Sequence, residues 1–258
     1  MITDQSDLSS LESVLAQAVR RAGVTGRVEL RETSDGETLL ELTPLSRTRV
    51  PFSPNPGEAT AWLQSEDVDA AAGYDDDGYL VISPRSKAGV HRLVERWLGP
   101  FIYAESVGEQ LRGALAQHEL NGEVAVLDAC SVDLVIQDSD NLATAVQLGA
   151  VLGASDIARG LRLHRPRGMS KLAGRMRLLL TGVVGHGVGV LAEAGCAHAE
   201  DELRLRLTVD QALRLAGRIA AEPSADSRET SLTSPANPSA PCAPLPPDPT
   251  NCSREPSG

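Results

Sequence analysis

Aromatic residues and lysines are scarce in this chain of 258 residues. Aromatics make up 3 % of the sequence and all seven lie between residues 52 and 103, so other stretches lack the rings on which single-stranded nucleic acids stack. Lysine occurs twice against 22 arginines, a bias typical of high-GC bacterial genomes. No run of about 18 apolar residues is present, which excludes an ordinary transmembrane helix. The first residues lack a basic segment followed by an apolar one, so we expect a cytoplasmic protein without a secretory signal.

Cysteine and histidine form no recognisable reactive or metal-binding pattern. The four cysteines, Cys130, Cys196, Cys242 and Cys252, include no CxxC pair of the kind that zinc sites and thioredoxin-like sites use. Cys196 precedes His198 closely, but nothing nearby supplies the oxyanion donor that nucleophilic catalysis also needs. We therefore expect free thiols in a reducing compartment, no metal, no cofactor, no catalytic residue and hence no enzyme.

Basic charge is also in deficit, because 24 Lys and Arg stand against 35 Asp and Glu, for a formal charge of −11. This balance argues against a whole surface that binds nucleic acid or an anionic membrane. Residues 222–258 hold nine of the sixteen prolines, seven serines and almost no large apolar residue. Such a segment cannot bury enough surface to offset its chain entropy, which predicts a disordered tail; a proline-rich docking peptide around 243–247 is the alternative.

The rest of the chain alternates between helical and strand-like patterns, which predicts an α+β fold. Turn signals at 34–36 and 75–78 separate short apolar runs and indicate hairpins. The glycine and proline at 99–100 are expected to end the helix before them, and Asp140 is a candidate N-cap. The predicted helices span 8–22, 57–64, 88–98, 107–120, 141–152, 170–180 and 209–220, and the predicted strands 27–30, 38–42, 47–52, 68–73, 79–82, 124–127, 132–136, 187–192 and 202–207, with an irregular connection at 155–168.

Three segments repeat the order strand, polar corner, amphipathic helix, beginning at Tyr79, Val132 and Leu203. Each follows a candidate partner strand. The repeat is too irregular for a solenoid and favours duplication of an α-β-β-α unit, with helices covering one face of an antiparallel sheet. We therefore expect two related α+β domains, 1–104 and 105–221, followed by the tail.

In the first hundred residues, the predicted order of helix, two or three strands, helix, two strands and helix resembles the type III secretion chaperone-like fold. The second half resembles a degraded copy of the same fold, with a basic linker at 157–177 in place of its middle strand. The resemblance lies in the order of elements and not in a sequence motif. It implies a protein-binding module without catalytic residues.

Charge is distributed unevenly along the chain. Residues 1–156 hold 11 basic and 25 acidic side chains, a net charge of −14, whereas residues 157–258 hold 13 and 10, a net charge of +3. No acid occurs within 157–192, and the planar guanidinium of arginine suits bidentate contacts with carboxylates or phosphates. Three interpretations stay open: pairing with the acidic half of the same chain or of another subunit, an acidic protein partner, or nucleic acid. The candidate partner-binding residues are Arg159, Arg162, Arg165, Arg167, Lys171 and Arg175.

Two further patterns have ordinary structural explanations. The Gly-rich stretch 182–189 surrounds His186 between a predicted helix and a predicted strand, the reverse of the order that phosphate-binding loops need. We interpret it as a turn that leads into a strand. The acidic run 75–78 lacks the ligand spacing of a calcium loop, and we interpret it as a charged hairpin turn.

The aromatic residues are expected to serve the core first. Trp62, Tyr79 and Trp97 fall on predicted helix and strand faces, where packing is their usual role. Phe101 and Tyr103 follow the predicted helix end and could instead anchor a partner, since aromatics are enriched at interface hot spots.

The sequence therefore predicts a cytoplasmic, non-enzymatic protein-interaction or adaptor module of chaperone-like type. Such a module could also form a homodimer. Its partner is expected to dock on a sheet face or an edge strand, with the basic segment 159–177 steering an acidic surface. The alternative is a nucleic-acid-associated protein that uses the same arginines on phosphates.

Overall fold

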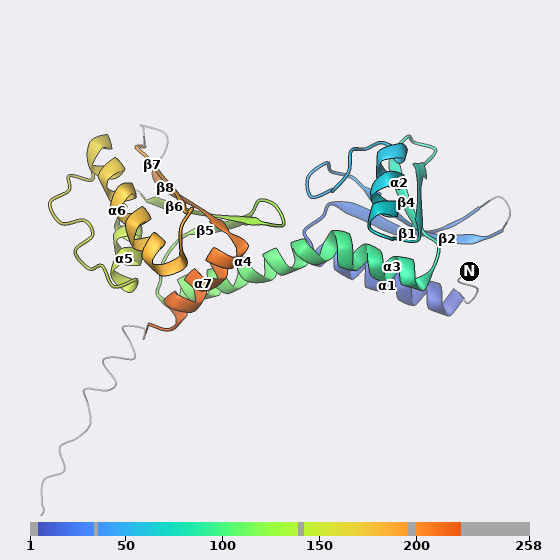
Figure 1. The fold of residues 1–258 in the computed structure, drawn as a ribbon, viewed down its shortest axis with the longest axis horizontal. Helices are drawn as coiled ribbons and strands as arrows, with labels where there is room; N and C mark the ends of the chain where they lie inside the picture. The colour runs from blue at the N-terminus through green and yellow to red at the C-terminus, as the bar shows by residue number, and fades with distance from the viewer. Residues whose placement is uncertain (1–4, 34–35, 139–141, 196–199, 223–258) are drawn as a thin grey trace, which may run out of the picture. The chain divides into compact units, whose positions relative to one another are not determined.

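Two four-stranded antiparallel sheets, each packed against helices, make up the part of the chain that the computed structural model describes (Figure 1). The described residues are 5–33, 36–138, 142–195 and 200–222. The predicted α+β class with two related halves is confirmed. By their contacts these residues belong to one unit, and the division into domains at 104/105 stays a prediction. The predicted tail, from residue 223 onward, lies outside the described residues, as does the proline-rich stretch 243–247.

The first half follows the order helix, two strands, helix, two strands, helix. Its elements are α1 (Gln5–Arg21), β1 (Gly26–Glu32), β2 (Thr38–Pro44), α2 (Pro56–Ser65), β3 (Ala70–Tyr74), β4 (Leu80–Pro84), α3 (Lys87–Leu93) and the π-helical turn η1 (Val94–Leu98). In the sheet the strands lie in the order β1-β2-β4-β3. Asn55 and Ser86 cap α2 and α3, because their side-chain oxygens accept backbone N–H groups of the first helical turn.

The second half repeats this arrangement. Its elements are α4 (Gly99–Gln117), β5 (Glu123–Val126), β6 (Ser131–Asp138), α5 (Ala143–Val151), α6 (Pro166–Val184), β7 (Gly189–Glu193), β8 (Asp201–Thr208) and α7 (Val209–Ala220). Its strands lie in the order β5-β6-β8-β7, which matches the first sheet strand for strand and supports the internal duplication. Thr208 and Gln211 form a capping box that fixes the start of α7.

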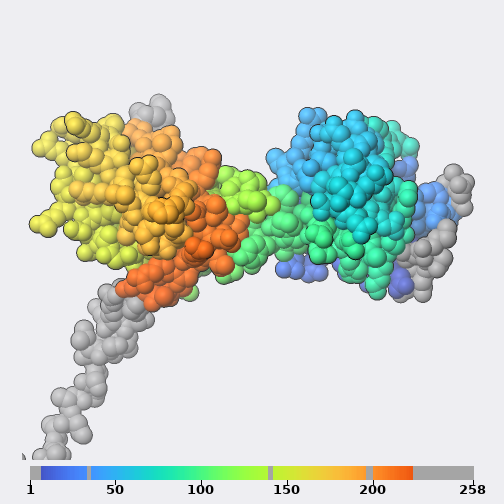
Figure 2. Space-filling view, viewed as in Figure 1, coloured from blue at the N-terminus to red at the C-terminus, as the bar shows by residue number. Residues whose placement is uncertain are grey.

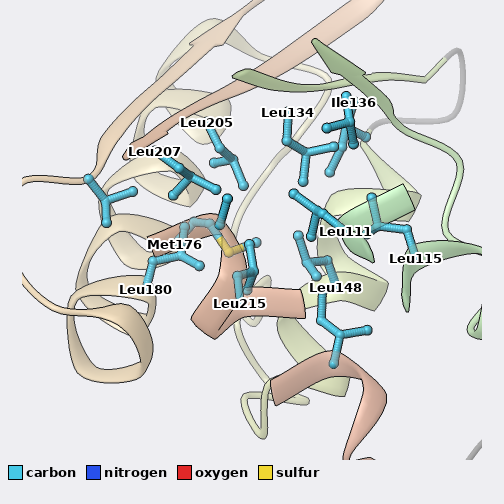
Figure 3. Close-up of a cluster of buried hydrophobic side chains, with 14 of the residues drawn as sticks. Leu111, Leu115, Leu134, Ile136, Leu148, Met176, Leu180, Leu205, Leu207 and Leu215 are labelled. Carbon is cyan, nitrogen blue, oxygen red and sulfur yellow. The ribbon is translucent and has the colours of Figure 1, made fainter. Parts of the chain in front are cut away.

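Alternation along the strands directs apolar side chains to the helix-covered face of each sheet. In β8, Leu203, Leu205 and Leu207 are buried, whereas Arg204 and Arg206 between them are exposed. Figure 3 shows the resulting core of the second half, where side chains from β6 and β8 point toward α4, α5, α6 and α7. The residues labelled there are Leu111, Leu115, Leu134, Ile136, Leu148, Met176, Leu180, Leu205, Leu207 and Leu215.

One continuous run of helical backbone, from Lys87 to Gln117, serves both cores. Trp97 and Leu98 in η1 are buried in the core of the first half. Val107 and Leu111 in α4 are buried in the core of the second half. The predicted helix end at 99–100 is therefore wrong.

Pro100 is tolerated because the π-helical turn rearranges the hydrogen bonds before it. The N–H of Gly99 donates to the carbonyl oxygen of Val94, five residues back. Pro100 then occupies the first turn of α4, where its missing N–H and its fixed φ are compatible with helix.

Three other predictions of local structure are corrected. No strand occurs at 47–52, because Arg49 adopts a left-handed conformation with φ of 64° that interrupts extended backbone. The irregular connection predicted at 155–168 consists mainly of turns and ends at 165, because residues 166–168 already belong to α6. The predicted N-cap Asp140 lies outside the described residues, and the N-cap of α5 is Leu142. The carboxylate of Asp138 supplies the missing acceptor, 2.9 Å from the backbone nitrogen of Thr144.

Arg49 joins segments that are far apart in the sequence, and no sequence signal pointed to it. Its Nη1 donates to the carbonyl oxygen of Ala22 at 2.8 Å and forms an ion pair with Glu105 at 2.6 Å. Its Nη2 donates to the carbonyl oxygen of Val126 at 2.7 Å. The indole N–H of Trp97 donates to the Arg49 carbonyl oxygen at 2.8 Å. The left-handed backbone thus places one guanidinium against the end of α1, against α4 and against β5.

Each sheet also carries a buried acid on the face turned away from the core. Asp133 in β6 is 3 % exposed, and both its carboxylate oxygens accept from Arg206 in β8, at 3.0 and 3.1 Å. Glu41 in β2 is 8 % exposed, but Arg31 comes no closer than 3.9 Å. Burial raises the pKa of Glu41 above its usual range, and the charge of Arg31 opposes this only in part.

The substitution Glu41→Gln is expected to stabilise the protein at neutral pH. Because the folded-state pKa is raised, the stabilising contribution of Glu41 is present below its unfolded pKa of about 4.3 and is lost as the pH rises through the folded value. The glutamine keeps the shape without the buried charge, so its advantage should vanish in acid. Urea unfolding at pH 7 and pH 4 measures this difference. Glu32→Gln, an exposed site on β1, is the control. An advantage that does not change with pH would contradict the explanation.

Candidate functional site

The basic segment of the sequence forms a surface that consists of α6 and the connection that leads into it. α6 begins with Pro166 after Arg165 at the N-cap, and its other face is buried in the core of the second half. The connection lies directly against the first turn of α6 at Gly168. A Cβ atom added to Gly168 would lie 2.0 Å from the carbonyl oxygen of Arg162, so only glycine allows this approach. Arg162 is thereby held beside the start of the helix.

Arg175, about two turns further along α6 than Gly168, holds the same connection. Its Nη1 donates to the carbonyl oxygens of Ile157 and Arg159, at 2.7 and 3.0 Å. The sequence selected Arg175 as a partner-binding residue, but these two hydrogen bonds give its guanidinium a structural role. Together with the contact at Gly168, they place the arginines of the connection beside those of α6.

The predicted partner-binding side chains are exposed, and Figure 2 shows this yellow-to-gold stretch on the surface of the molecule. Among the residues described, none of the six forms an ion pair with an acid, whereas Arg49, Arg92 and Arg206 each do. Pairing with the acidic half of the same chain is therefore not how the described part of the chain neutralises these cations. A second subunit, an acidic protein and nucleic acid stay open as the source of counter-charge. The six residues are Arg159, Arg162, Arg165, Arg167, Lys171 and Arg175.

α6 also presents an apolar side chain that the sequence analysis missed. Leu178 is 73 % exposed and follows Arg175 and Arg177 on the helix. It is the most exposed large apolar side chain within the described ranges. The periodic pattern of α6 marks this position as facing away from Leu172 and Met176, but an isolated exposed leucine is common and gives no warning in a sequence.

A separate apolar groove of about 540 Å³ lies in the first half. Leu45, Tyr74 and Tyr79 line it and are 54 %, 58 % and 52 % exposed. The expectation that Tyr79 is buried in the core is wrong, because the turn at 75–78 leaves Tyr79 just before β4 begins. Among the described residues that line the groove, Arg47 is the one that carries a charge.

The other aromatic residues divide between core and surface. Trp97 is 1 % exposed, and Trp62 is half-buried with its ring 5.4 Å from that of Phe52, as a packing role predicts. Phe101 is half-buried against the core of the first half, whereas Tyr103 is exposed on α4. An anchoring role for Tyr103 stays a prediction.

The acidic run 75–78 is a hairpin turn as predicted, and the Gly-rich stretch forms a turn from Gly185 onward, whereas residues 182–184 belong to α6. Between α6 and β7, Gly185 and Gly187 have φ values of 101° and 87°, and the amide of Gln211 donates to the carbonyl oxygen of His186 at 2.7 Å. In the β3–β4 hairpin, a carboxylate oxygen of Asp75 accepts from the backbone N–H groups of Asp77 and Tyr79. In each turn, a side chain of the protein itself is therefore hydrogen-bonded to the backbone.

One of the four cysteines and four of the five histidines fall in the described ranges. Cys130 is a free, exposed thiol in the β5–β6 turn. Cys196, His198, Cys242 and Cys252 lie outside the described residues. The described part of the chain contains no cluster of three or more His, Cys, Asp or Glu side chains that could hold a metal ion. The absence of a catalytic or metal site stays a prediction.

Comparison of the chain with protein-family models, with curated proteins and with solved structures found no match. Within the described ranges, no helix combines the length and the apolar character that crossing a membrane requires. The function must therefore be argued from the surface itself.

Proposed function

We propose that this chain is a cytoplasmic, non-enzymatic protein-interaction module that docks an acidic protein partner on the surface formed by α6 and the connection before it. One observation carries the proposal: six exposed basic side chains lie together without an acidic neighbour in ion-pair contact among the described residues. Clustered like charges repel one another, and a partner of opposite charge removes this cost on binding.

The arrangement of the cations favours recognition of a surface over chemistry. Arg162, Arg165 and Arg167 form no side-chain hydrogen bond with other described residues, and they lie beside the start of helix α6, whose opposite face is buried. Their guanidinium groups are free to meet carboxylates in bidentate geometry. The positive electrostatic potential of these arginines also steers acidic partners and raises their association rate.

The order of elements agrees with an adaptor of chaperone-like type. In the first half the order is helix, two strands, helix, two strands, helix, which is one of the two forms on which the resemblance to the type III secretion chaperone-like fold rests. In the second half two helices, α5 and α6, lie between the two hairpins, where the first half has the single helix α2.

Substitution of Arg162, Arg165 and Arg167 together by alanine tests the proposal. We expect capture of acidic proteins from a nuclease-treated bacterial lysate to fall at least about tenfold, because three surface ion pairs of up to about 1 kcal/mol each are removed. The melting temperature should not change. The matched control replaces Arg20, Arg21 and Arg85, which are also exposed, by alanine and should leave capture intact.

The same experiment separates the nucleic-acid alternative. If the retained material is nucleic acid that nuclease removes, its affinity should fall steeply with salt, and the slope should drop by about 0.9 per arginine removed. That outcome would replace the acidic protein by nucleic acid as the partner. Equal loss of capture in the control variant would show that net charge alone matters and would contradict a specific surface.

A further inference from the structure

The outward line of α6 combines positive charge with an apolar centre. Arg167, Lys171, Gly174, Leu178 and Gly182 follow one another at spacings of three or four residues, so they share one face of the helix. This face lies opposite the side that is buried in the core. Leu178, at 73 % exposure, stands near the middle of the C-terminal half of this face.

Folding of the second half does not require a leucine at this position. The core face of α6 is complete without it, through residues such as Met169, Leu172, Met176 and Leu180. A Cβ atom added to Gly174, one turn before Leu178, would meet nothing within 4 Å, so the surface beside the leucine is open to an approaching backbone. An exposed leucine among cations is a suitable central contact for an interface whose rim is charged.

The charges around Leu178 select among the possible occupants. Lys171, Arg175 and Arg177 precede Leu178 within about two turns of the helix, so a second copy of α6 would bring like charges together at the contact. Nucleic acid would meet the cations with phosphates but would offer Leu178 no aliphatic partner, and the surface lacks an aromatic ring for a base. An amphipathic helix with acidic flanks satisfies both the cations and the leucine.

We propose that the outward face of α6 binds an acidic amphipathic helix of a partner protein, with Leu178 as the apolar anchor and Arg167 and Lys171 as contacts for its carboxylates. This inference rests on the proposed function and specifies its partner. It adds a requirement that charge alone does not have, namely that the acidic partner carries apolar residues along one helical face.

Fluorescence anisotropy with synthetic peptides tests the inference on the full chain. The probe is a labelled helical peptide of about 20 residues with leucines at helical spacing and glutamates beside them. A second peptide has the same composition in scrambled order, and a labelled DNA duplex is the third probe. We expect the amphipathic peptide to bind most tightly. Leu178→Ser should weaken it about tenfold, the usual scale for loss of an apolar anchor.

Two variants make the result specific. Leu191→Ser removes another exposed leucine, 53 % exposed on β7, and should leave the affinity unchanged. Lys171→Glu should weaken binding of the acidic peptide, because it replaces a cation by a carboxylate. Because neither Leu178 nor Lys171 is buried, the melting temperature should stay that of the original protein.

The other outcomes overturn the inference in distinguishable ways. Equal binding of the scrambled peptide would agree with an acidic partner but would contradict a helical partner anchored on Leu178. Tight binding of the duplex with no binding of either peptide would overturn the proposed function as well. A dimer that Leu178→Ser dissociates, measured by light scattering, would assign this face to a second copy.

Discussion

Replacement of Arg49 by alanine is expected to lower the free energy of unfolding by about 3 kcal/mol, the scale on which removal of one partner breaks a largely buried ion pair. The Arg49 side chain is 15 % exposed and binds Glu105 together with the carbonyl oxygens of Ala22 and Val126. Its loss leaves two acceptors and one carboxylate in a poorly solvated site. Urea unfolding monitored by circular dichroism gives the value.

Two variants separate the role of the guanidinium from that of the segment. Arg47→Ala changes an exposed arginine two residues away and should cost little. Arg49→Lys keeps the charge but cannot reach three acceptors with a fork of donors, so most of the loss should persist. Full stability of the lysine variant would show that charge alone is needed at this position.

Gly168→Ala is expected to destabilise the second half by about 2 kcal/mol, within the range for an overpacked contact. The new Cβ atom would lie 2.0 Å from the carbonyl oxygen of Arg162 and 2.6 Å from its carbonyl carbon. Because both are backbone atoms, the connection must move away from α6. Arg162 would move with it, so binding of the acidic partner should weaken together with the fall in melting temperature.

Gly174→Ala is the matched control for this prediction. It lies in the same helix, and an added Cβ atom would meet nothing within 4 Å. Alanine is the better helix former by up to about 1 kcal/mol, so this variant should gain stability. A loss of stability in Gly168→Ala and a gain in Gly174→Ala would show that the connection packs directly against Gly168. Equal gains would contradict the close contact.

The sequence predicts elements well where local pattern and packing agree. α7 was expected at 209–220 and is found at Val209–Ala220, because its apolar spacing is regular and Thr208 caps it. β8 alternates apolar and polar residues from Leu203 to Thr208, and this alternation alone indicates a strand with one buried face. In α7 and β8 the local sequence pattern and packing in the core favour the same secondary structure.

Prediction failed where a distant contact decides the backbone. The pair at 99–100 is a strong helix terminator by itself, but the two cores hold the helix on both sides of it, and the π-helical turn removes the conflict. The run 47–52 has a strand-like composition. Its conformation is set instead by Arg49, whose partners lie up to 77 residues away in the sequence.

The candidate surface was predictable as a stretch but not as a surface. The absence of acids from 157–192 is visible in the sequence and identified the basic residues. The role of Arg175 depends on the carbonyl groups of Ile157 and Arg159, which only the folded connection brings within reach. Leu178 matters because it faces solvent, and which side of α6 packs on the sheet is settled by the tertiary structure.

The π-helical turn η1 has a consequence for how the chain tolerates changes of length. Each helical residue turns the side-chain direction by about 100°, and a turn that holds one extra residue offsets the phase of everything after it by that angle. η1 therefore acts as an angular spacer between the side chains that serve the first core and those that serve the second. Deletion of one residue within 94–98 would reset this phase and turn one set of side chains away from its core. Exposed turns carry no such phase, so insertions and deletions that distinguish the two halves should accumulate in turns and not in the helix that the halves share.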